Sequence, residues 1–495
     1  MKNINPLHVI DFYKSGHIKF NPEGTQMIYT NFTPRSTKFL PKMDGYDDKI
    51  VAVGLQYYLM YFLGEVWNDG FFNLPKKQVL ERFKRRMDTS LGVGNVGTEH
   101  IAALKDLNYL PISVKALPEG SLINAGIPYF TIRNTHNDFS WLTNYLEDSL
   151  SCLVWKTSTA ATIVRRYRQI ATRYAKSTGV DLNLVDYLLH DFSLRGCNGL
   201  QDALMVGGAF LMFQKGTDNV AAIDFLEQYY GANADNELIG CSVPANEHAC
   251  VCAGGKENEF GNYKRWITQT FPSGIVSLVS DTWNLWNVVT NYLPRLKEDI
   301  MRRDGKVVIR PDSSPKTPLE IICGDKDAPI GSPENKGVIQ LLWEIFGGTI
   351  NSKGYRELDS HIGCIYGESI QPVLAQKIYQ QLQNQGFAIS NIFFGVGSYS
   401  FMASRDTVGY AAKATAAIVN GELRNIFKSP VTDSGTKKSA KGLLRVDLID
   451  NEYVLKDQCT PEEELGGELR EVFRDGKLLI EHKLSDIRER ALKSI

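Results

Sequence analysis

The chain has 495 residues, a formal net charge of −1 and a hydrophobic fraction of 43%. This length predicts a large core and two or more domains, and the near-zero charge excludes a protein attracted as a whole to nucleic acid or acidic lipid. No apolar stretch approaches the ~18 residues that cross a bilayer, and MKNINPLHVIDFYKSGH lacks a signal-peptide core. We therefore expect a cytoplasmic protein with no membrane or nucleic-acid partner, whose eight scattered cysteines are reduced and buried.

The first third of the chain predicts a mixture of helices and short strands. Helices are expected at 49–67, 75–91, 98–111 (with Thr98 as its cap) and 141–178, and strands at 25–35 and within 112–135. GVGNVG at 92–97 matches the dinucleotide fingerprint, which requires a preceding strand. A charged helical pattern precedes it instead, so we interpret it as a connection between two helices.

Residues 211–400 repeat one pattern, in which a short apolar run stops at polar, chemically capable residues and a helical stretch usually follows. Buried parallel strands show this pattern. The runs end near Asp218, His248, Asp281, Arg310, Asp312, Glu368 and Ser398. Because the active site of a parallel barrel lies at the carboxyl ends of its strands, this region predicts an α/β barrel enzyme acting on an anionic substrate.

The last hundred residues return to β character. Hairpins are expected with turns at Asp450-Asn451 and Asp475-Gly476, before a terminal helix. The polar, basic segment 428–442 predicts a mobile surface loop. We infer a catalytic α/β barrel over residues 181–400 and a second, mixed α+β domain built from residues 1–180 and 401–495.

Two segments, one just before the barrel strands and one at a strand end, offer groups that suit a flat, amide-bearing ligand. Phe192 could stack on a ring and Arg195 could bind phosphate, although a core phenylalanine beside a surface arginine has the same spacing. Asp218 could accept hydrogen bonds from an amide, since an ionised carboxylate only accepts. It could equally cap the helix that follows.

Other strand ends offer acids, a cation and an imidazole. Glu247 precedes His248, whose imidazole could act as acid, base or nucleophile, although a lone histidine is more often structural. Asp281 and Asp312 could ligate Mg²⁺ or bind ribose, and Arg310 could face the same pocket as Asp312. Salt bridges are the alternative for each.

Glycine-bearing strand ends and scattered cations could bind phosphate. Backbone N–H groups at Gly367 and Gly397 could cradle an anion, or form ordinary turns. Arg35, Arg405 and Lys413 add positive charge, as do the arginines at the strand ends.

Taken in order, these segments resemble the nicotinamide phosphoribosyltransferase family. The matching strings are DFYKSGH, LHDFSLRG, FQKGTDNVAA, SVPANEH, VSLVSDTWN, VIRPDS, FGVGS and IFKSPVTD, which span nearly the whole chain. The resemblance implies a homodimer of type II phosphoribosyltransferase fold, with an irregular α/β barrel and an active site at the subunit interface. It also implies Mg²⁺ and the joining of nicotinamide to 5-phosphoribosyl-1-pyrophosphate, with ATP phosphorylating a histidine.

The resemblance assigns roles to residues of this chain. Phe192 and Tyr13 of the other subunit would sandwich the pyridine ring, with Asp218, Arg310, Asp11 and Ser277 completing that pocket. Arg195, Arg35, Arg405 and Lys413 would hold phosphate and pyrophosphate, beside Gly367, Glu368, Gly397 and Ser398. Asp281 and Asp312 would arrange Mg²⁺, pyrophosphate and ribose, and His248, with Glu247 beside it, would take phosphate from ATP.

Three positions depart from the family pattern. Glu368 stands where an aspartate is usual, Ser193-Leu194 replaces glycine–tyrosine, and Ser398 occupies a position that is often glycine. They put the geometry of the phosphate site in question more than the reaction.

Three alternative functions remain open from the sequence. A nicotinate phosphoribosyltransferase shares fold and chemistry, but the Asp218 carboxylate would repel nicotinate. A barrel glycosidase would use two strand-end carboxylates, leaving the cations and the histidine without a role. A non-catalytic binding protein on this scaffold would not need the full set of acids, arginines and histidine.

Overall fold

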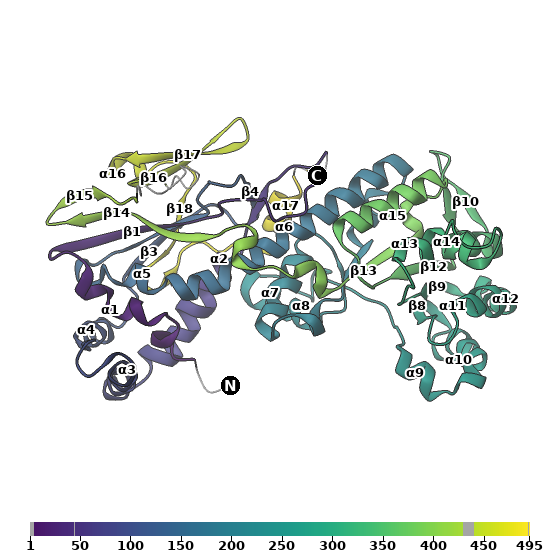
Figure 1. Ribbon diagram of the computed structural model, residues 1–495, viewed down its shortest axis with the longest axis horizontal. Coiled ribbons are helices and arrows are strands. Elements are labelled where there is room, and N and C mark those ends of the chain that lie inside the picture. The colour runs from purple at the N-terminus through teal and green to yellow at the C-terminus, as the bar shows by residue number, and fades with distance from the viewer. Residues whose placement is uncertain (1–3, 44, 429–439, 494) are drawn as a thin grey trace.

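The computed structural model describes residues 4–43, 45–428, 440–493 and 495. Figure 1 shows two sheets at opposite ends of the molecule, with the long helix α6 (Glu147–Thr178) running from the first towards the helices of the second. Within the described ranges, no helix is both long and apolar enough to cross a membrane.

The first sheet is antiparallel and takes strands from both ends of the chain. In sheet order the strands are β15 (Glu422–Asn425), β14 (Ala411–Val419), β1 (Thr25–Thr33), β5 (Phe130–Asn134), β3 (Ile112–Ala116), β18 (Arg470–Arg474) and β19 (Lys477–Leu478). Strand β1 lies between β14 and β5, so the beginning and the end of the chain share one sheet. The exact domain boundaries stay a prediction.

The second sheet is parallel and closes on itself. Its strands are, in order, β7 (Gly216–Thr217), β6 (Leu189–Asp191), β13 (Phe393–Val396), β12 (Ile362–Tyr366), β9 (Asp304–Arg310) and β8 (Ser273–Val279). Residues 241–246 bridge its two edges: Cys241 N donates to Lys215 O (2.7 Å) beside β7, and Ser277 N of β8 donates to Pro244 O (2.9 Å). The sheet is therefore an irregular barrel, and the predicted α/β fold class is confirmed.

Helices follow most of these parallel strands. They are α7 (Leu200–Leu211), α8 (Val220–Tyr230), α9 (His248–Ala253), α10 (Glu259–Arg265), α11 (Leu285–Asn287), α12 (Leu293–Met301), α13 (Pro318–Cys323), α14 (Pro333–Phe346) and α15 (Pro372–Asn384). A short hairpin of β10 (Gly348–Ile350) and β11 (Arg356–Leu358) precedes β12. All five residues of β12 are buried, as is typical of a parallel strand covered on both faces.

One predicted helix is partly wrong. The segment 49–67 begins as strand β2 (Ile50–Ala52), which pairs with β4 (Ser121–Ile123). Gly54 then adopts a φ of 105°, which favours glycine, and helix α2 (Leu55–Tyr57) continues into π-helical turns over Tyr58–Val66. Pairing with β4 overrides the helical pattern because β-branched residues suit a buried strand.

The other predicted helices of this region are present. They are α3 (Lys76–Leu91), α4 (Glu99–Leu107), α5 (Leu142–Tyr145) and α6, and helix α1 (Phe12–Phe20) precedes them. Residues 92–97 connect α3 to α4 without a preceding strand, which confirms that they are not a dinucleotide fingerprint. Thr98 stands at the N-cap of α4 but makes no capping bond, because its ψ of −1° is not the extended conformation of a capping residue.

Both predicted hairpins near the carboxyl terminus form. Strands β16 (Leu443–Ile449) and β17 (Glu452–Cys459) turn at Asp450 and Asn451, whose φ values of 51° and 63° suit a two-residue hairpin turn. Strands β18 and β19 turn at Asp475-Gly476, and α17 (Leu484–Leu492) follows. Most of the loop predicted at 428–442 lies outside the described residues.

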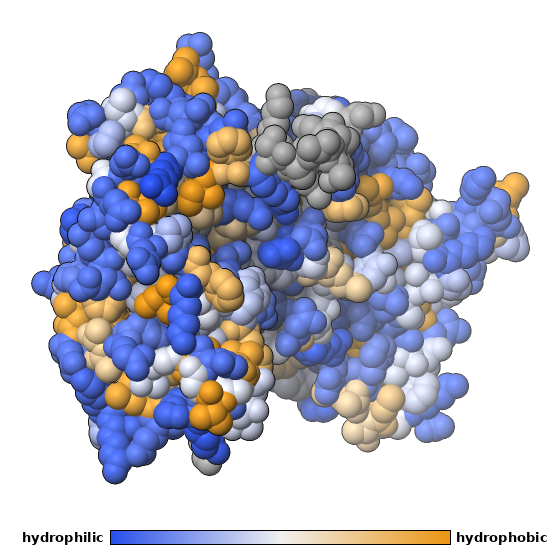
Figure 2. Space-filling model, turned by 60° about the vertical axis from the view of Figure 1, so that its left-hand side comes forward, coloured by the Kyte–Doolittle hydropathy of each residue, from blue (hydrophilic) through white to orange (hydrophobic). Residues whose placement is uncertain are grey.

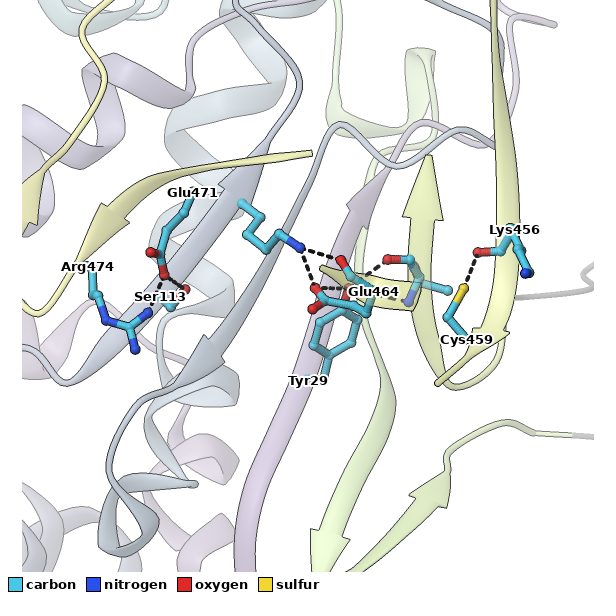
Figure 3. A network of polar contacts seen from close by, with 9 residues as sticks. Tyr29, Ser113, Lys456, Cys459, Glu464, Glu471 and Arg474 are labelled. Atoms are coloured by element: carbon cyan, nitrogen blue, oxygen red, sulfur yellow. Dashed lines mark hydrogen bonds and ion pairs between the residues drawn. The ribbon is translucent and has the colours of Figure 1, made fainter. Parts of the chain in front are cut away.

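A buried polar network fixes the β16–β17 hairpin and α16 (Pro461–Glu464) to the antiparallel sheet (Figure 3). The Tyr29 hydroxyl of β1 donates to Leu444 O (3.4 Å) and to Glu464 Oε1 (3.5 Å), and Lys115 Nζ of β3 donates to the same carboxylate oxygen (3.0 Å). Glu464 is 1% exposed. Its charge is therefore compensated inside the fold, as buried carboxylates require.

All eight cysteines are free, which agrees with the reduced state expected from the sequence. Their burial differs from the expectation: Cys323, Cys364 and Cys459 are buried, whereas Cys152, Cys250 and Cys252 are exposed.

Candidate functional site

The candidate residues of the barrel gather at one mouth, because the strands that precede them are parallel. Phe192 follows β6, Asp218 follows β7, Asp281 follows β8, and Arg310 ends β9 with Asp312 just beyond it. Gly367 follows β12 and Gly397 follows β13. This edge is where the active sites of α/β barrels form.

His248 lies between two carboxylates at this mouth. Its Nδ1 is 2.9 Å from Thr282 Oγ1, and its Nε2 is 3.8 Å from Asp281 Oδ1 and 3.5 Å from Asp312 Oδ2. Glu247 is exposed, and no ion pair joins it to His248 in the part of the chain that the structure describes. Asp281 and Asp312 are therefore the acids that lie within ion-pair distance of this imidazole in the described structure.

Asp281 is held in one orientation and keeps one oxygen unused. Its side chain is 6% exposed, and Oδ2 accepts from Asp312 N (2.8 Å) and Ser313 Oγ (2.6 Å). Among the described residues, no hydrogen-bond donor reaches Oδ1. This orphaned oxygen beside the Asp312 carboxylate fits Mg²⁺, which proteins bind through one or two carboxylates together with substrate phosphates.

Glu368 faces the same mouth despite its longer side chain. Burial is the main cause that raises the pKa of the neighbouring Tyr366, and the carboxylates of Glu368, Asp281 and Asp312 raise it further. The Tyr366 phenol thus lies among three acids. The charge of Glu368 therefore acts on the same phenol as the charges of Asp281 and Asp312.

The Phe192 ring packs on bare backbone. A Cβ added to Gly395 of β13 would lie 2.2 Å from the ring carbons of Phe192, and one added to Gly367 would lie 3.0 Å from them. Phe192 N also donates to Val396 O (3.0 Å). Glycine at 395 and 367 therefore allows an aromatic ring to lie across the ends of β12 and β13.

Polar groups lie on or after other strands of the same barrel. The exposed Asp218 carboxylate accepts from Ser242 Oγ through Oδ1, while an Arg310 guanidinium nitrogen donates to Asn246 O. Ser277 of β8 is 3% exposed, and its hydroxyl has no hydrogen-bond partner among the described residues. The mouth thus offers an aromatic face, an acceptor and a cation to a flat polar ligand.

Ser398 is accommodated by a neighbouring glycine. A Cβ on Gly196 would lie 2.0 Å from Ser398 Oγ, so the serine occupies space that a side chain at 196 would need. Exposed Arg195 precedes that glycine. The turn after β6 and the turn after β13 therefore lie side by side, as a shared phosphate site requires.

The remaining candidates form a second group on the antiparallel sheet and the start of α6. Desolvation lowers the pKa of Lys413, Glu147 opposes this shift, and Arg35, Lys428 and Arg405 add to it, so these cations are neighbours. Asp11 N donates to Asp148 Oδ2 (2.7 Å) at the start of α1, where Tyr13 is 59% exposed.

Most of the elements that carry the two groups lie apart in the molecule. Figure 1 shows α1, β1 and β14 at the opposite end from β8, β9 and α9, whereas Arg405 lies in a short 3-10 turn that packs on α6. The structure therefore divides the predicted site into a barrel set and a sheet set. The barrel set is Phe192, Arg195, Asp218, Glu247, His248, Ser277, Asp281, Arg310, Asp312, Gly367, Glu368, Gly397 and Ser398; the sheet set is Asp11, Tyr13, Arg35, Arg405 and Lys413.

Sequence reasoning missed three contacting residues. Thr282 bonds His248, Ser242 bonds Asp218, and Asn246 accepts from Arg310 while its own Oδ1 accepts from Val279 N (2.7 Å). Each lies within a segment already singled out. Serine, threonine and asparagine are common in loops, so their types alone carried no signal.

Known proteins resemble this chain along most of its length. Residues 187–477 match the nicotinate phosphoribosyltransferase (NAPRTase) family. A nicotinamide phosphoribosyltransferase of Acinetobacter baylyi is 50% identical over 499 residues, covering 99% of this chain and 98% of the relative. Another, of Mycoplasma pneumoniae, is 31% identical over 474 residues and covers 89% and 95%.

Solved structures support the fold. The crystal structure of human nicotinic acid phosphoribosyltransferase matches with a TM-score of 0.54 at 15% identity, covering 98% of this chain and 93% of that one. A nicotinate-nucleotide pyrophosphorylase of Pyrococcus furiosus matches with a TM-score of 0.57 at 14% identity, covering 98% and 92%. The family match and the 50% identical relative show that the chain belongs to the nicotinate phosphoribosyltransferase family and is an enzyme of the pentosyltransferase class.

Proposed function

We propose that this enzyme is a cytoplasmic nicotinamide phosphoribosyltransferase of NAD synthesis. It transfers the 5-phosphoribosyl group of phosphoribosyl pyrophosphate to nicotinamide, giving nicotinamide mononucleotide and pyrophosphate. The observation that carries the choice of nicotinamide is the exposed Asp218 carboxylate, which follows β7 just as Phe192 follows the paired strand β6. A carboxylate accepts hydrogen bonds from an amide NH₂ group but repels the carboxylate of nicotinate.

The reaction needs positioning more than acid–base chemistry. The bond between C1 of ribose and the pyrophosphate oxygen breaks, its electron pair leaves with pyrophosphate, and the pyridine nitrogen donates its lone pair to C1. No proton moves in this step. Phe192 would fix the plane of the pyridine ring, Asp218 and Arg310 would fix its rotation, and catalysis would come from alignment and charge stabilisation.

Acids and cations would hold the donor. Asp281 and Asp312 would bind Mg²⁺, which supplies positive charge next to the leaving pyrophosphate when bound. Asp281 Oδ1, which accepts no hydrogen bond from the described residues, supports this role. Arg195, Arg35, Arg405 and Lys413 would neutralise the phosphate groups, beside the turns at Gly367, Glu368, Gly397 and Ser398.

ATP would phosphorylate His248 on Nε2. Nδ1 is engaged with Thr282, while Nε2 faces Asp281 and Asp312. In this step the terminal phosphorus–oxygen bond of ATP breaks, ADP leaves, and neutral Nε2 forms a bond to phosphorus. The new phosphate would add charge beside Mg²⁺ and pyrophosphate, which couples ATP hydrolysis to substrate affinity.

A homodimer would bring the two sets together. The barrel set has two cations, Arg195 and Arg310, for a donor with two phosphate ends, and the sheet set adds Arg35, Arg405 and Lys413, which lie near one another. Phe12 and Tyr13 are 46% and 59% exposed, and Figure 2 shows apolar patches on an otherwise largely hydrophilic face. A symmetric dimer would place the sheet set of one subunit over the barrel mouth of the other.

One assay tests the proposed reaction. The enzyme is incubated with phosphoribosyl pyrophosphate, Mg²⁺ and either nicotinamide or nicotinate, with and without ATP, and the mononucleotide is identified by mass. We expect nicotinamide mononucleotide, formed faster with ATP. Formation of nicotinate mononucleotide alone would favour the nicotinate enzyme instead.

Asp218→Asn should shift the preference between the two pyridines. Removing the charge removes the repulsion of nicotinate, and the amide group of asparagine can donate to its carboxylate. We expect the ratio of kcat/KM for nicotinamide over nicotinate to fall about 100-fold, the range reached when a polar recognition contact is mismatched. An unchanged ratio in competition assays would exclude this role for Asp218.

Gly395→Ala should weaken pyridine binding. The new Cβ would lie 2.2 Å from the Phe192 ring, so the ring must move. We expect KM for the pyridine substrate to rise about 10-fold, with KM for the donor unchanged. Gly64→Ala is the matched control, because the nearest atom to its Cβ would be 3.6 Å away; equal kinetics of the two variants would argue against a pyridine site on Phe192.

A further inference from the structure

A fully buried polar cluster lies beneath Phe192 and Asp218. Asp191, Ser193 and Asn219 each show 0% relative exposure, and they stand at the ends of β6 and β7. Burying a carboxylate and two polar side chains costs folding free energy unless their groups are bonded. The cluster lies next to two residues that are proposed to contact substrate. Packing alone therefore does not account for its polar groups.

Asp191 is bonded to both turns. Its Oδ1 accepts from Ser193 N (2.9 Å), which fixes the turn carrying Phe192 and Arg195. Its backbone carbonyl accepts from Asp218 N (3.0 Å). One residue thus holds the aromatic face and the amide acceptor of the proposed pocket.

Asn219 and α7 close the cluster from below. Asn219 N donates to Thr217 Oγ1 (3.0 Å), and its Nδ2 donates to Ala203 O of α7 (3.0 Å). A Cβ on Gly207 of α7 would lie 2.4 Å from Asn219 Nδ2 and 3.1 Å from Asp191 Oδ2. Helix α7 therefore approaches both side chains only because residue 207 is glycine.

Opposing effects act on the pKa of the Asp191 carboxyl. Burial is the main cause that raises its pKa, while the hydrogen bonding of Ser193 opposes the shift. Its Oδ2 has no hydrogen-bond partner within 3.5 Å among the described residues. The side chain is inaccessible, so it acts on substrate only through the residues it holds.

We propose that Asp191 is a positioning residue that fixes the Phe192 ring relative to the Asp218 carboxylate and thereby sets the preference for an amide-bearing pyridine. This role rests on the proposed function of the same site. It deepens that function by placing part of the substrate choice on a residue that never touches the substrate.

The test compares Asp191→Ala, Asp191→Asn and a matched control. Alanine removes the acceptor for Ser193 N, whereas asparagine keeps an acceptor oxygen and nearly the same volume. Glu119→Gln is the control, since Glu119 is a buried carboxylate that accepts from Gly54 N (2.9 Å), Gln56 N (2.7 Å) and the Tyr129 hydroxyl (2.8 Å), away from the barrel mouth. For each protein we would measure Tm, KM for both pyridines and KM for phosphoribosyl pyrophosphate.

We expect Asp191→Ala to raise KM for nicotinamide about 10-fold or more and to lower the nicotinamide-over-nicotinate preference, with KM for the donor unchanged. Asp191→Asn should raise the KM for nicotinamide by a smaller factor, again with the KM for the donor unchanged. Glu119→Gln should lower Tm without changing either KM. If the alanine variant does not fold, the KM values of the asparagine variant test the proposal.

Two results would overturn the proposal: an unchanged pyridine KM in Asp191→Asn, or changes in both substrate KM values together. A wild-type enzyme that accepts only nicotinate would refute the proposed function instead. The positioning role of Asp191 would then be tested by the KM for nicotinate. A failure of the positioning role can therefore be distinguished from a failure of the proposed function.

Discussion

A heterodimer of Arg405→Ala and Asp312→Ala subunits should have about half of wild-type activity, although each variant alone should be nearly inactive. Arg405 belongs to the sheet set and Asp312 to the barrel set. If each active site joins the barrel of one subunit to the sheet of the other, both substitutions fall in one site of the heterodimer. The second site is then intact.

The experiment requires co-expression with two affinity tags and purification through both. A heterodimer of Arg195→Ala and Asp312→Ala subunits is the matched control. Both of these residues belong to the barrel set, so each of its sites carries one substitution and activity should stay low. If the Arg405/Asp312 heterodimer were as inactive as this control, the proposed exchange of residues between subunits would be excluded.

His248→Ala should abolish both covalent labelling by ATP and the stimulation of mononucleotide synthesis by ATP. Phosphate on an imidazole nitrogen is labile in acid and stable in base, so labelled wild-type protein should lose its phosphate only in acid. The basal reaction without ATP should persist, because no step of ribosyl transfer needs the imidazole as an acid or base. We would measure radiolabel from the terminal phosphate of ATP and the rate with and without ATP.

His361→Ala offers a control with similar chemistry at another place. His361 Nδ1 lies 2.6 Å from Asp359 Oδ1, so it too is a histidine paired with an aspartate. Its replacement should leave label and stimulation unchanged. Persistent labelling of His248→Ala would mean that another residue carries the phosphate.

The mouth of the barrel was predictable because strand ends are local features of the sequence. Apolar runs that stop at Asp218, Asp281 and Arg310 predict buried strands, and parallel strands bring their ends together. What the sequence could not give was the contact between neighbours. The 2.9 Å contact of His248 with Thr282, and its lack of an ion pair with Glu247 in the described structure, depend on how two separate loops meet.

The segment 49–67 shows that the local sequence can also predict the wrong secondary structure. Its apolar residues fit a buried helix, yet Ile50–Ala52 form a strand because β4, some seventy residues later in the chain, offers a partner. Local periodicity cannot register a partner so distant in sequence.

The sequence by itself determined the fold class, the residue types of the site and the family resemblance. Strand patterns and motifs are short segments of sequence, so they can be recognised without knowing the tertiary structure. Only the tertiary structure decided which of these residues are neighbours. It closed the barrel through residues 241–246, laid Phe192 over Gly395, buried Asp191 at the end of β6, and put α1, β1 and β14 at the opposite end of the molecule from β8, β9 and α9. The physical reason is that contacts between distant segments depend on packing and chain topology, which residue types alone do not specify.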